Sequence, residues 1–516
     1  MTIVTYLRRL IWERQMLMNK RLSLLFVLLL SASSLLPAQE VPERKLSPQK
    51  LEADVRYLAS DELRGRFSTE PGGRLAADYI EKRLRESGAR PLAALGGYRQ
   101  SVPLQTLPAS PEQGSVKLSD QEFAAGKDLL VMGGGQLRGE FPVAAGRRME
   151  DLPQDLKGRV VLVAFGDPER PGSPRAAIRA GSAKARRAHE RGAAALIEVY
   201  SGGGFENFVR FLGRSRVSSG PLDPESSATP HLLLAAGPEL WNRLEQAEDL
   251  EAVLDTPARL ARPASSDNVV AWVEGNDPEL GKELVGLSAH YDHVGADPAS
   301  RGATPEDFIF NGARDNAMGV TALMAAADAL AAQPPKRSVL LIAFTGEELG
   351  LLGSAYMAEH PPFDLNHLVF LLNSDSGGYT DTDVATVVGL ERVTVRPLIE
   401  QACREFGLEA IPNPAPEQRL FTRSDNIHFA RLGIPAPTFS LGFRAWTREL
   451  LEHYHRPSDE VTEDFDFDYL LRFSQAFTHT IRAIADSPDQ PRWVEGQPYI
   501  EAWKELYGSR TQTGQE

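Results

Sequence analysis

The sequence predicts an α/β fold: a largely parallel or mixed sheet flanked by helices on both faces, with a smaller β-rich α/β domain inserted into it. Two observations lead to this prediction. From residue 266 onward, apolar β-rich segments alternate strictly with segments of helical periodicity, as they do where crossover helices join parallel strands. Between residues 126 and 262, a second series of short apolar strands has helices of its own, which indicates the insertion.

Length and composition fit a soluble globular protein of more than one domain. A chain of 516 residues is too long for one compact core. Its apolar fraction of 42% and charged fraction of 24% are ordinary for globular chains. The net charge of -14 and the lack of a basic run argue against nonspecific nucleic-acid binding. The sequence gives no indication of an oligomeric state.

The N-terminus has the pattern of a secretory signal peptide, which we place at residues 1–38. Lys20 and Arg21 precede an apolar run from Leu22 to Leu36, and small residues follow it. Met18 is an alternative start. The run is short for a stable membrane span, although an uncleaved anchor is the competing interpretation. We therefore expect an exported protein, periplasmic or extracellular.

Cys403 is the single cysteine of the chain, so no intrachain disulfide can form. It lies in a helix-like stretch, 398–406, and we interpret it as a core residue. No cysteine stands at the predicted cleavage point, which argues against a lipoprotein anchor.

The segment 39–125 is predicted to begin the larger domain. Within 46–92, apolar residues recur at helical spacing in two stretches, and Ser87-Gly88 ends the second one. Residues 93–130 are rich in Gly, Pro and Ser and indicate strands joined by loops.

The inserted domain is predicted at 126–262. Its expected strands are 158–165, 193–200 and 231–234, and its expected helices are 177–192 and 238–247. The Gly- and Ser-rich stretch 202–230 is predicted to be a long surface loop.

The catalytic region is predicted at 263–490, followed by a C-terminal tail at 491–516. Its expected strands are 268–273, 284–288, 338–344 and 368–372, and its expected helices are 317–332 and 349–359. Ligands of such sheets bind outside the carboxyl ends of the strands, so polar residues that follow these strands are candidate site residues.

Five short segments of this region carry potential metal ligands. They are His290-Tyr291-Asp292, Asp315-Asn316, Glu347-Glu348, Asp375 and His455. Zinc takes imidazole and carboxylate ligands, and two zinc ions about 3.5–4 Å apart need a bridging carboxylate and ligands on each side. The segments supply that number of ligands, with one glutamate left as a base.

Each segment taken alone also has a plain structural explanation. Asp315 could cap a helix, and the two glutamates could complement a helix dipole. Asp375 could lie in a simple turn. The loop near residue 455 holds two histidines, His453 and His455, and either could be a surface residue. Asp292 is close enough in sequence to His290 to accept a hydrogen bond from its ring.

Other catalytic chemistries lack their motifs. The sequence has no Gly-x-Ser-x-Gly elbow, no phosphate-binding Gly-x-x-x-x-Gly-Lys loop and no His-Glu-x-x-His helix. His231 and His360 have no partners at motif spacing and are interpreted as structural or exposed.

The combined motifs resemble those of the co-catalytic dinuclear zinc aminopeptidases. These include secreted bacterial leucyl-type aminopeptidases and the glutamate carboxypeptidase and transferrin-receptor relatives. The resemblance covers about 46–485 and rests on His-Tyr-Asp-His-Val-Gly, Gly-Ala-x-Asp-Asn-Ala-x-Gly, Phe-Thr-Gly-Glu-Glu-Leu-Gly, Asn-Ser-Asp, Tyr-His-x-Pro-x-Asp, the Ser424-Asp425 stretch and residues 57–66. The inserted region resembles a protease-associated domain.

The resemblance implies roles for the candidate residues. One zinc would be held by His290 and His455, the other by Glu348 and Asp375, and Asp315 would bridge them. Glu347 would be the general base. Asp292 would orient His290, and Tyr454 would stabilise the oxyanion. Arg314 and Met318 depart from the family pattern, and Arg314 is expected to alter local charge and substrate preference.

The implied function is that of a secreted or periplasmic zinc aminopeptidase acting on peptides with a free N-terminus. A carboxypeptidase or dipeptidase of the same family and a glutaminyl-cyclase-like acyltransferase, which needs one zinc, remain open. A receptor without activity is the third alternative, and the complete ligand set argues against it.

Overall fold

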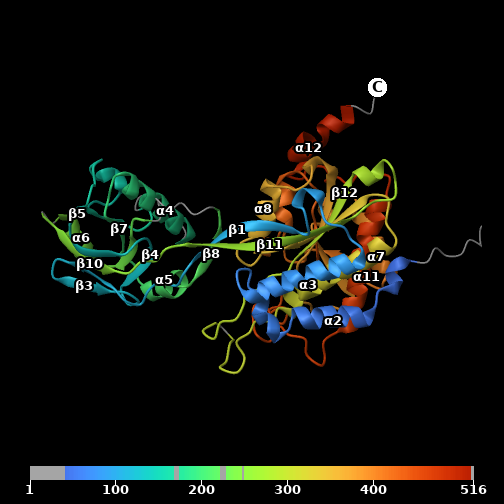
Figure 1. Cartoon of the computed structure of the whole chain (residues 1–516), viewed down its shortest axis with the longest axis horizontal. Coiled ribbons are helices and arrows are strands. Elements are labelled where there is room, and N and C mark those ends of the chain that lie inside the picture. Colours follow the sequence, from blue (N-terminus) through green and yellow to red (C-terminus); the bar gives the residue numbers. More distant parts are fainter. Residues whose placement is uncertain (1–40, 168–173, 221–227, 247–248, 301, 513–516) are drawn as a thin grey trace, which may run out of the picture. The chain divides into compact units, whose positions relative to one another are not determined.

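The computed structural model describes residues 41–167, 174–220, 228–246, 249–300 and 302–512 (Figure 1). Residues 48–516 form one unit, and the described part of 1–47 holds one short 3₁₀ helix, η1 (Pro42–Lys45). The predicted signal peptide lies outside the described residues. Among the described helices, none has the length and apolar character that crossing a membrane requires.

The larger sheet has nine strands in the order β16-β15-β17-β14-β12-β13-β11-β1-β8. Its strands are β1 (Arg99–Leu107), β8 (Arg216–Ser219), β11 (Arg262–Val273), β12 (Leu284–His290), β13 (Ser338–Phe344), β14 (Leu368–Ser374), β15 (Val384–Val388), β16 (Glu409–Pro412) and β17 (Thr438–Ser440). β12 pairs in parallel with both β13 and β14. β11 pairs antiparallel with β13 and β1. The sheet is therefore mixed, with a parallel centre.

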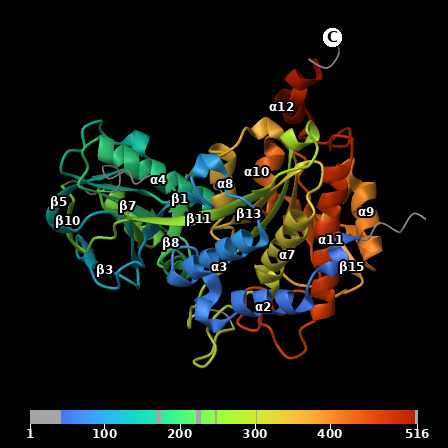
Figure 2. The same cartoon turned by 45° about the vertical axis from the view of Figure 1, so that its right-hand side comes forward.

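Helices cover both faces of this sheet, as predicted. On one face lie α2 (Pro48–Leu58), α3 (Pro71–Ser87), α7 (Met318–Ala332) and α11 (Phe467–Asp486), and on the other lie α8 (Leu352–Glu359) and α10 (Asn426–Arg431) (Figures 1 and 2). α9 (Arg396–Glu405) packs beside α11. Every residue of β13 and β14 is buried, which is why both read as continuous apolar runs.

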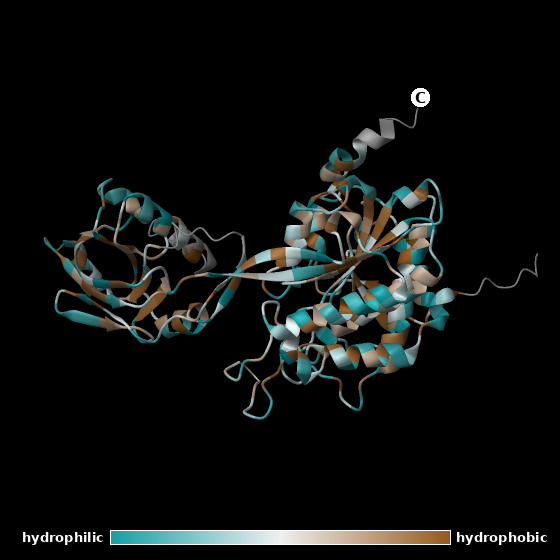
Figure 3. Cartoon of the chain, in the orientation of Figure 1, coloured by the Kyte–Doolittle hydropathy of each residue, from teal (hydrophilic) through white to brown (hydrophobic). Residues whose placement is uncertain are grey.

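The second sheet has eight strands in the order β3-β2-β10-β5-β6-β7-β9-β4. Its strands are β2 (Ser115–Leu118), β3 (Gln121–Ala124), β4 (Leu129–Gly133), β5 (Leu137–Ala145), β6 (Val160–Ala164), β7 (Ala195–Tyr200), β9 (His231–Ala235) and β10 (Glu251–Thr256), and its helices are α4 (Pro174–Glu190), α5 (Phe205–Leu212) and α6 (Pro238–Gln246). Apolar residues line the strands of both sheets (Figure 3). The predicted insertion 126–262 covers most of the second sheet, which also includes β2 and β3.

The stretch 202–230 is not the long surface loop that we predicted. It contains α5, and it contains β8, which pairs with β1 of the larger sheet. Phe205, Phe208 and Leu212 of α5 pack into a small cluster with Phe165 and Tyr200. The glycines on either side of this helix obscured its apolar periodicity.

The segment 491–516, predicted to be a tail, contains α12 (Ile500–Gln512). Trp493 is buried, and its indole N–H donates a 2.8 Å hydrogen bond to the Gly433 carbonyl. Cys403 is fully buried, and burial raises the pKa of its thiol to about 12, as expected for a core residue.

A buried ion pair joins α2 to α3. Arg83 donates to both carboxylate oxygens of Asp54 at 2.9 Å, and it also reaches Asp328 of α7 at 3.1 Å. The Arg83 and Asp54 side chains are only 5% and 2% exposed. Removing one member of such a pair leaves an uncompensated buried charge.

We expect Asp54→Ala to lower the free energy of unfolding by roughly 3–5 kcal/mol, measured by urea denaturation. The matched control is Glu52→Ala in the same helix, which breaks the exposed Glu52–Arg56 pair and should cost less than about 0.5 kcal/mol. Equal losses in the two variants would contradict a stabilising role for the buried pair.

Candidate active site

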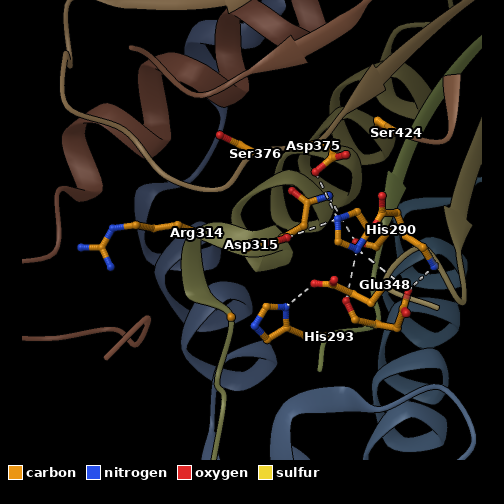
Figure 4. Close-up of polar contacts among 12 residues, drawn as sticks. His290, His293, Arg314, Asp315, Glu348, Asp375, Ser376 and Ser424 are labelled. Atoms are coloured by element: carbon orange, nitrogen blue, oxygen red, sulfur yellow. Dashed lines mark hydrogen bonds and ion pairs between the residues drawn. The ribbon is translucent and has the colours of Figure 1, made fainter. Parts of the chain in front are cut away.

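The candidate residues converge at the carboxyl ends of the central strands (Figure 4). His290 is the last residue of β12, Glu347 and Glu348 follow β13, and Asp375 follows β14. Asp315 lies in η6 (Ala313–Ala317), directly before α7. His455 is supplied by the loop that precedes α11. The strand-end prediction is therefore confirmed for the three segments that follow parallel strands.

The ligand-type atoms form two groups that share Asp315. In the first group, His290 Nε2 lies 3.4 Å from Asp315 Oδ1 and 3.3 Å from Asp375 Oδ1. In the second group, His455 Nε2 lies 3.3 Å from Asp315 Oδ2 and 3.0 Å from Glu348 Oε2. Within each group the atoms lie within 4.8 Å of one another. Each oxygen of Asp315 thus faces a different group, as a bridging carboxylate requires.

This grouping corrects the pairing that we predicted, in which His290 shared an ion with His455 and Glu348 shared one with Asp375. The structure places His290 with Asp375 and His455 with Glu348. The physical reason is the sheet order: β12 and β14 are parallel neighbours, so the residues at their ends lie side by side. His453 instead contacts Ser458 Oγ at 3.0 Å and belongs to neither group among the described residues.

His293 is a site residue that the sequence analysis missed. Its Nδ1 lies 2.8 Å from Glu348 Oε1, and the ring belongs to the second group. The signal was present in the sequence, since His293 follows His290 by three residues in the same strand-end loop. It was overlooked because five ligands had already satisfied the expected count.

The carboxylates of the cluster favour positive charge beside them. Burial lowers the pKa of His290, but the carboxylates of Glu347, Asp315 and Asp375 raise it well above its ordinary value. Burial likewise lowers the pKa of His455, while Asp315 and Glu348 raise it to about 10. Imidazole and carboxylate groups concentrated in this way are the ligands of zinc-type ions.

Several buried atoms of the cluster also need partners. Among the described residues, both ring nitrogens of His293, Glu348 Oε1 and His455 Nε2 have no hydrogen-bond partner. Leaving buried polar atoms unsatisfied is costly. The donor atoms of the two groups therefore fit divalent metal ions.

Glu347 and Asp292 lie beside the two groups. Glu347 lines the cavity over the cluster, and burial raises the pKa of its carboxyl well above the usual range. The Asp292 carboxylate accepts hydrogen bonds from the Glu347 backbone N–H at 3.1 Å and from Ser68 Oγ at 3.0 Å. His290 Nδ1 lies 3.2 Å from the backbone oxygen of Asp292 and 3.9 Å from its carboxylate. Asp292 thus contacts both the candidate base and a candidate ligand.

Tyr454 lines the same cavity. Its ring stacks on the His455 ring, with centroids 4.0 Å apart and an interplanar angle of 21°. Burial and the surrounding carboxylates raise the pKa of the phenol, so the hydroxyl stays protonated and can donate a hydrogen bond.

Three polar side chains hold the ligand loops in place. Asp459 accepts hydrogen bonds from the backbone N–H groups of Arg314 and Asp315 at 3.0 and 3.1 Å. The buried Arg66 donates to the carbonyls of Tyr291 and Gly312 at 2.8 and 2.9 Å. Asn316 donates from its side chain to the Ser374 carbonyl at 2.8 Å.

Arg314 itself points away from the two groups (Figure 4). Its guanidinium pairs with Asp459 at 3.1 Å and lies over the rings of Tyr379 and Phe465. The ion pair with Asp459 neutralises its charge, so its observed contacts are structural.

One wall of the cavity is apolar. Val388, Phe443 and Leu450 are almost fully buried there, and Trp446 packs against Phe443 with ring centroids 6.0 Å apart. The carboxylates of Asp315, Glu347, Glu348 and Asp375 line the same cavity. The cavity thus combines acidic and apolar side chains.

Comparison with known proteins finds similarity to peptidases. Residues 268–481 match the description of peptidase family M28. Aminopeptidase YwaD of Bacillus subtilis is 23% identical over 67% of this chain and 67% of its own length. A "probable zinc metalloprotease" of Leptosphaeria maculans is 25% identical over 46% of this chain, which spans 61% of that relative.

A solved structure shows the same fold. The aminopeptidase from Aneurinibacillus sp. strain AM-1 superposes with a TM-score of 0.52 at 18% identity, and the match covers 89% of this chain and 97% of the other. The motif resemblance, the matched domain and the fold agree. Residues 268–481 thus match peptidase family M28, and the chain shares the fold of a solved aminopeptidase.

Proposed function

We propose that this chain is an exported, zinc-dependent aminopeptidase that removes N-terminal residues from peptides. The observation that supports this most directly is the pair of ligand groups sharing Asp315, with the carboxylate of Glu347 beside them in one cavity. The names of the relatives agree with it, since they include an aminopeptidase and a zinc metalloprotease. The expected signal peptide is the reason for proposing export.

Two zinc ions per chain fit the donor set. His290, Asp315 and Asp375 would hold one, and Asp315, Glu348 and His455 the other. When bound, zinc supplies Lewis acidity that polarises a scissile carbonyl and makes water nucleophilic at neutral pH.

The protein residues supply the proton transfers and the positioning. Glu347 accepts the proton of the attacking water at its carboxylate and delivers it to the leaving amine. The Tyr454 hydroxyl donates a hydrogen bond to the carbonyl oxygen as negative charge develops there. Asp292 positions Glu347 through its backbone N–H and His290 through the ring contact, so base and ligand keep a fixed relation.

The cavity also favours a particular substrate. A free N-terminal ammonium is attracted by Glu347, the carboxylate of this cavity that would hold no ion. The wall of Val388, Phe443, Trp446 and Leu450 suits an apolar first side chain, such as leucine or phenylalanine.

A carboxypeptidase is the second candidate, and one observation favours it. Arg423 also lines the cavity, and a guanidinium is the natural partner of a C-terminal carboxylate. Arg423 is exposed, however, and four carboxylates line the same cavity. For the second sheet, we propose a protease-associated domain, in line with the motif resemblance.

Replacing Glu347 tests the proton-transfer role. We expect Glu347→Gln to lower kcat by about 10²–10⁴-fold, because the amide cannot accept the proton, while zinc stays bound. Hydrolysis of leucine 4-nitroanilide and elemental analysis measure the two effects. The control is Glu452→Gln, an exposed glutamate on the loop of His455. Near-normal turnover by the Glu347→Gln variant would refute the assignment.

Replacing Asp375 tests the number and grouping of the ions. We expect Asp375→Ala to lower bound zinc from two ions to about one per chain, because Asp315, Glu348 and His455 remain together. The exposed Asp383 provides the control, and Asp383→Ala should keep both ions. Retention of two ions in Asp375→Ala would contradict the grouping.

A substrate panel tests the end of the peptide and the side chain. We expect kcat/KM for leucyl and phenylalanyl anilides to exceed that for aspartyl and lysyl anilides by roughly 10–200-fold, as apolar pockets allow. N-acetylated peptides should not be cleaved. Cleavage of blocked peptides from the C-terminus would support the carboxypeptidase instead. Ring closure of N-terminal glutamine would support the cyclase.

A further inference from the structure

His293 is the most completely buried imidazole of the cluster. Its exposed fraction is 0%, compared with 33% for the His455 side chain. Within the described residues, neither of its ring nitrogens has a hydrogen-bond partner. Burying an imidazole without hydrogen-bond partners costs free energy of folding. Another interaction of this ring must therefore offset that cost.

The ring approaches the second ligand group in the same way as His455 does. His293 Nδ1 lies 2.8 Å from Glu348 Oε1, and His455 Nε2 lies 3.0 Å from Glu348 Oε2. Both nitrogens remain without hydrogen-bond partners among the described residues, although both are this close to a carboxylate oxygen. These nitrogen and oxygen atoms lie close together but are not aligned for hydrogen bonds. Ligands around one metal ion have this kind of arrangement.

The distances suit a common ion. The atoms of His293, Asp315, Glu348 and His455 all lie within 4.8 Å of one another. Ligands at roughly 2.0–2.2 Å from a zinc ion lie at most about twice that distance apart. The four side chains can therefore bind one ion with small adjustments of their rotamers.

The surrounding backbone keeps the ring in this position. A Cβ atom at Gly312 would lie 2.6 Å from the His293 ring, and Gly312 has a φ of +59° that favours glycine. The His293 and His455 rings meet edge to face, with centroids 5.4 Å apart. The backbone N–H of His293 is directed to the Arg66 carbonyl at 3.4 Å. The site thus leaves space for this imidazole and fixes where it lies.

We propose that His293 is a fourth protein ligand of the ion held by Asp315, Glu348 and His455, an inference that rests on the proposed dinuclear site. The two ions then differ. The ion of His290, Asp315 and Asp375 has three protein ligands, while the other has four and is held more tightly. During chelation, the ion with three protein ligands leaves first.

The direct test counts imidazoles on a single ion. In Asp375→Ala loaded with one zinc per chain, X-ray absorption spectroscopy should show two imidazoles on that zinc, from His293 and His455. One imidazole would overturn the proposal, because His293 would then only contact Glu348. This measurement leaves His293 unchanged and so does not depend on how well a His293 variant folds.

The second test measures affinity. In the same Asp375→Ala background, His293→Ala should weaken Co²⁺ binding by about 100-fold or more, since loss even of residues behind the ligands costs about 10–100-fold. The visible Co²⁺ spectrum should also change with the lower coordination number. The control is His453→Ala, two residues from His455 and outside both groups. An unchanged affinity and spectrum in a folded His293→Ala variant would overturn the proposal.

These measurements separate this inference from the proposed function. Neither of them requires peptide hydrolysis. A protein that shows two imidazoles on the ion of Asp315, Glu348 and His455 but cleaves no peptide would support His293 as a ligand and refute the proposed peptidase activity. An active enzyme with only one imidazole on that ion would support the peptidase activity and refute His293 as a ligand.

Discussion

The concentration of buried carboxylates at one edge of the sheet is the constraint on which the site depends. Asp315 and Glu348 have ligand atoms within 4.8 Å of each other and are only 5% and 7% exposed. The buried Asp292 contacts Glu347, and Asp375 lines the same cavity. Three histidines lie among them. Such an arrangement is unfavourable without cations, so the binding of ions and the stability of these loops are coupled. Ions bound there would supply the Lewis acidity that the proposed peptidase needs.

The loops that carry the ligands are held by polar contacts from distant parts of the chain. Arg66 lies between the first helices and binds carbonyls on both sides of the 291–312 loop. Asp459 comes from the loop of His455 and binds the backbone next to Asp315. Asn316 joins the ends of β12 and β14. These contacts fix the ligand positions before any ion binds, which lowers the entropic cost of forming the site.

The asymmetry between the two ligand groups has a structural origin. The first group lies over two parallel neighbours, β12 and β14, whose ends approach each other directly. The second collects residues from three loops, and it includes the more deeply buried His293 as well as the partly exposed His455. A group with more protein ligands suits an ion that stays bound.

The sequence alone determined the alternation of strands and helices and the positions of His290, Glu348 and Asp375 after strands, because hydrophobic periodicity is a local property. It also located Asp315 and His455 through their motifs. The tertiary structure alone decided which ligands lie together, because strands that are neighbours in a sheet need not be consecutive in the sequence. It also revealed His293, whose importance depends on burial against Gly312 and Glu348. Similarly, α5 and β8 are stabilised by packing against Phe165 and pairing with β1, contacts between segments that are far apart in the sequence.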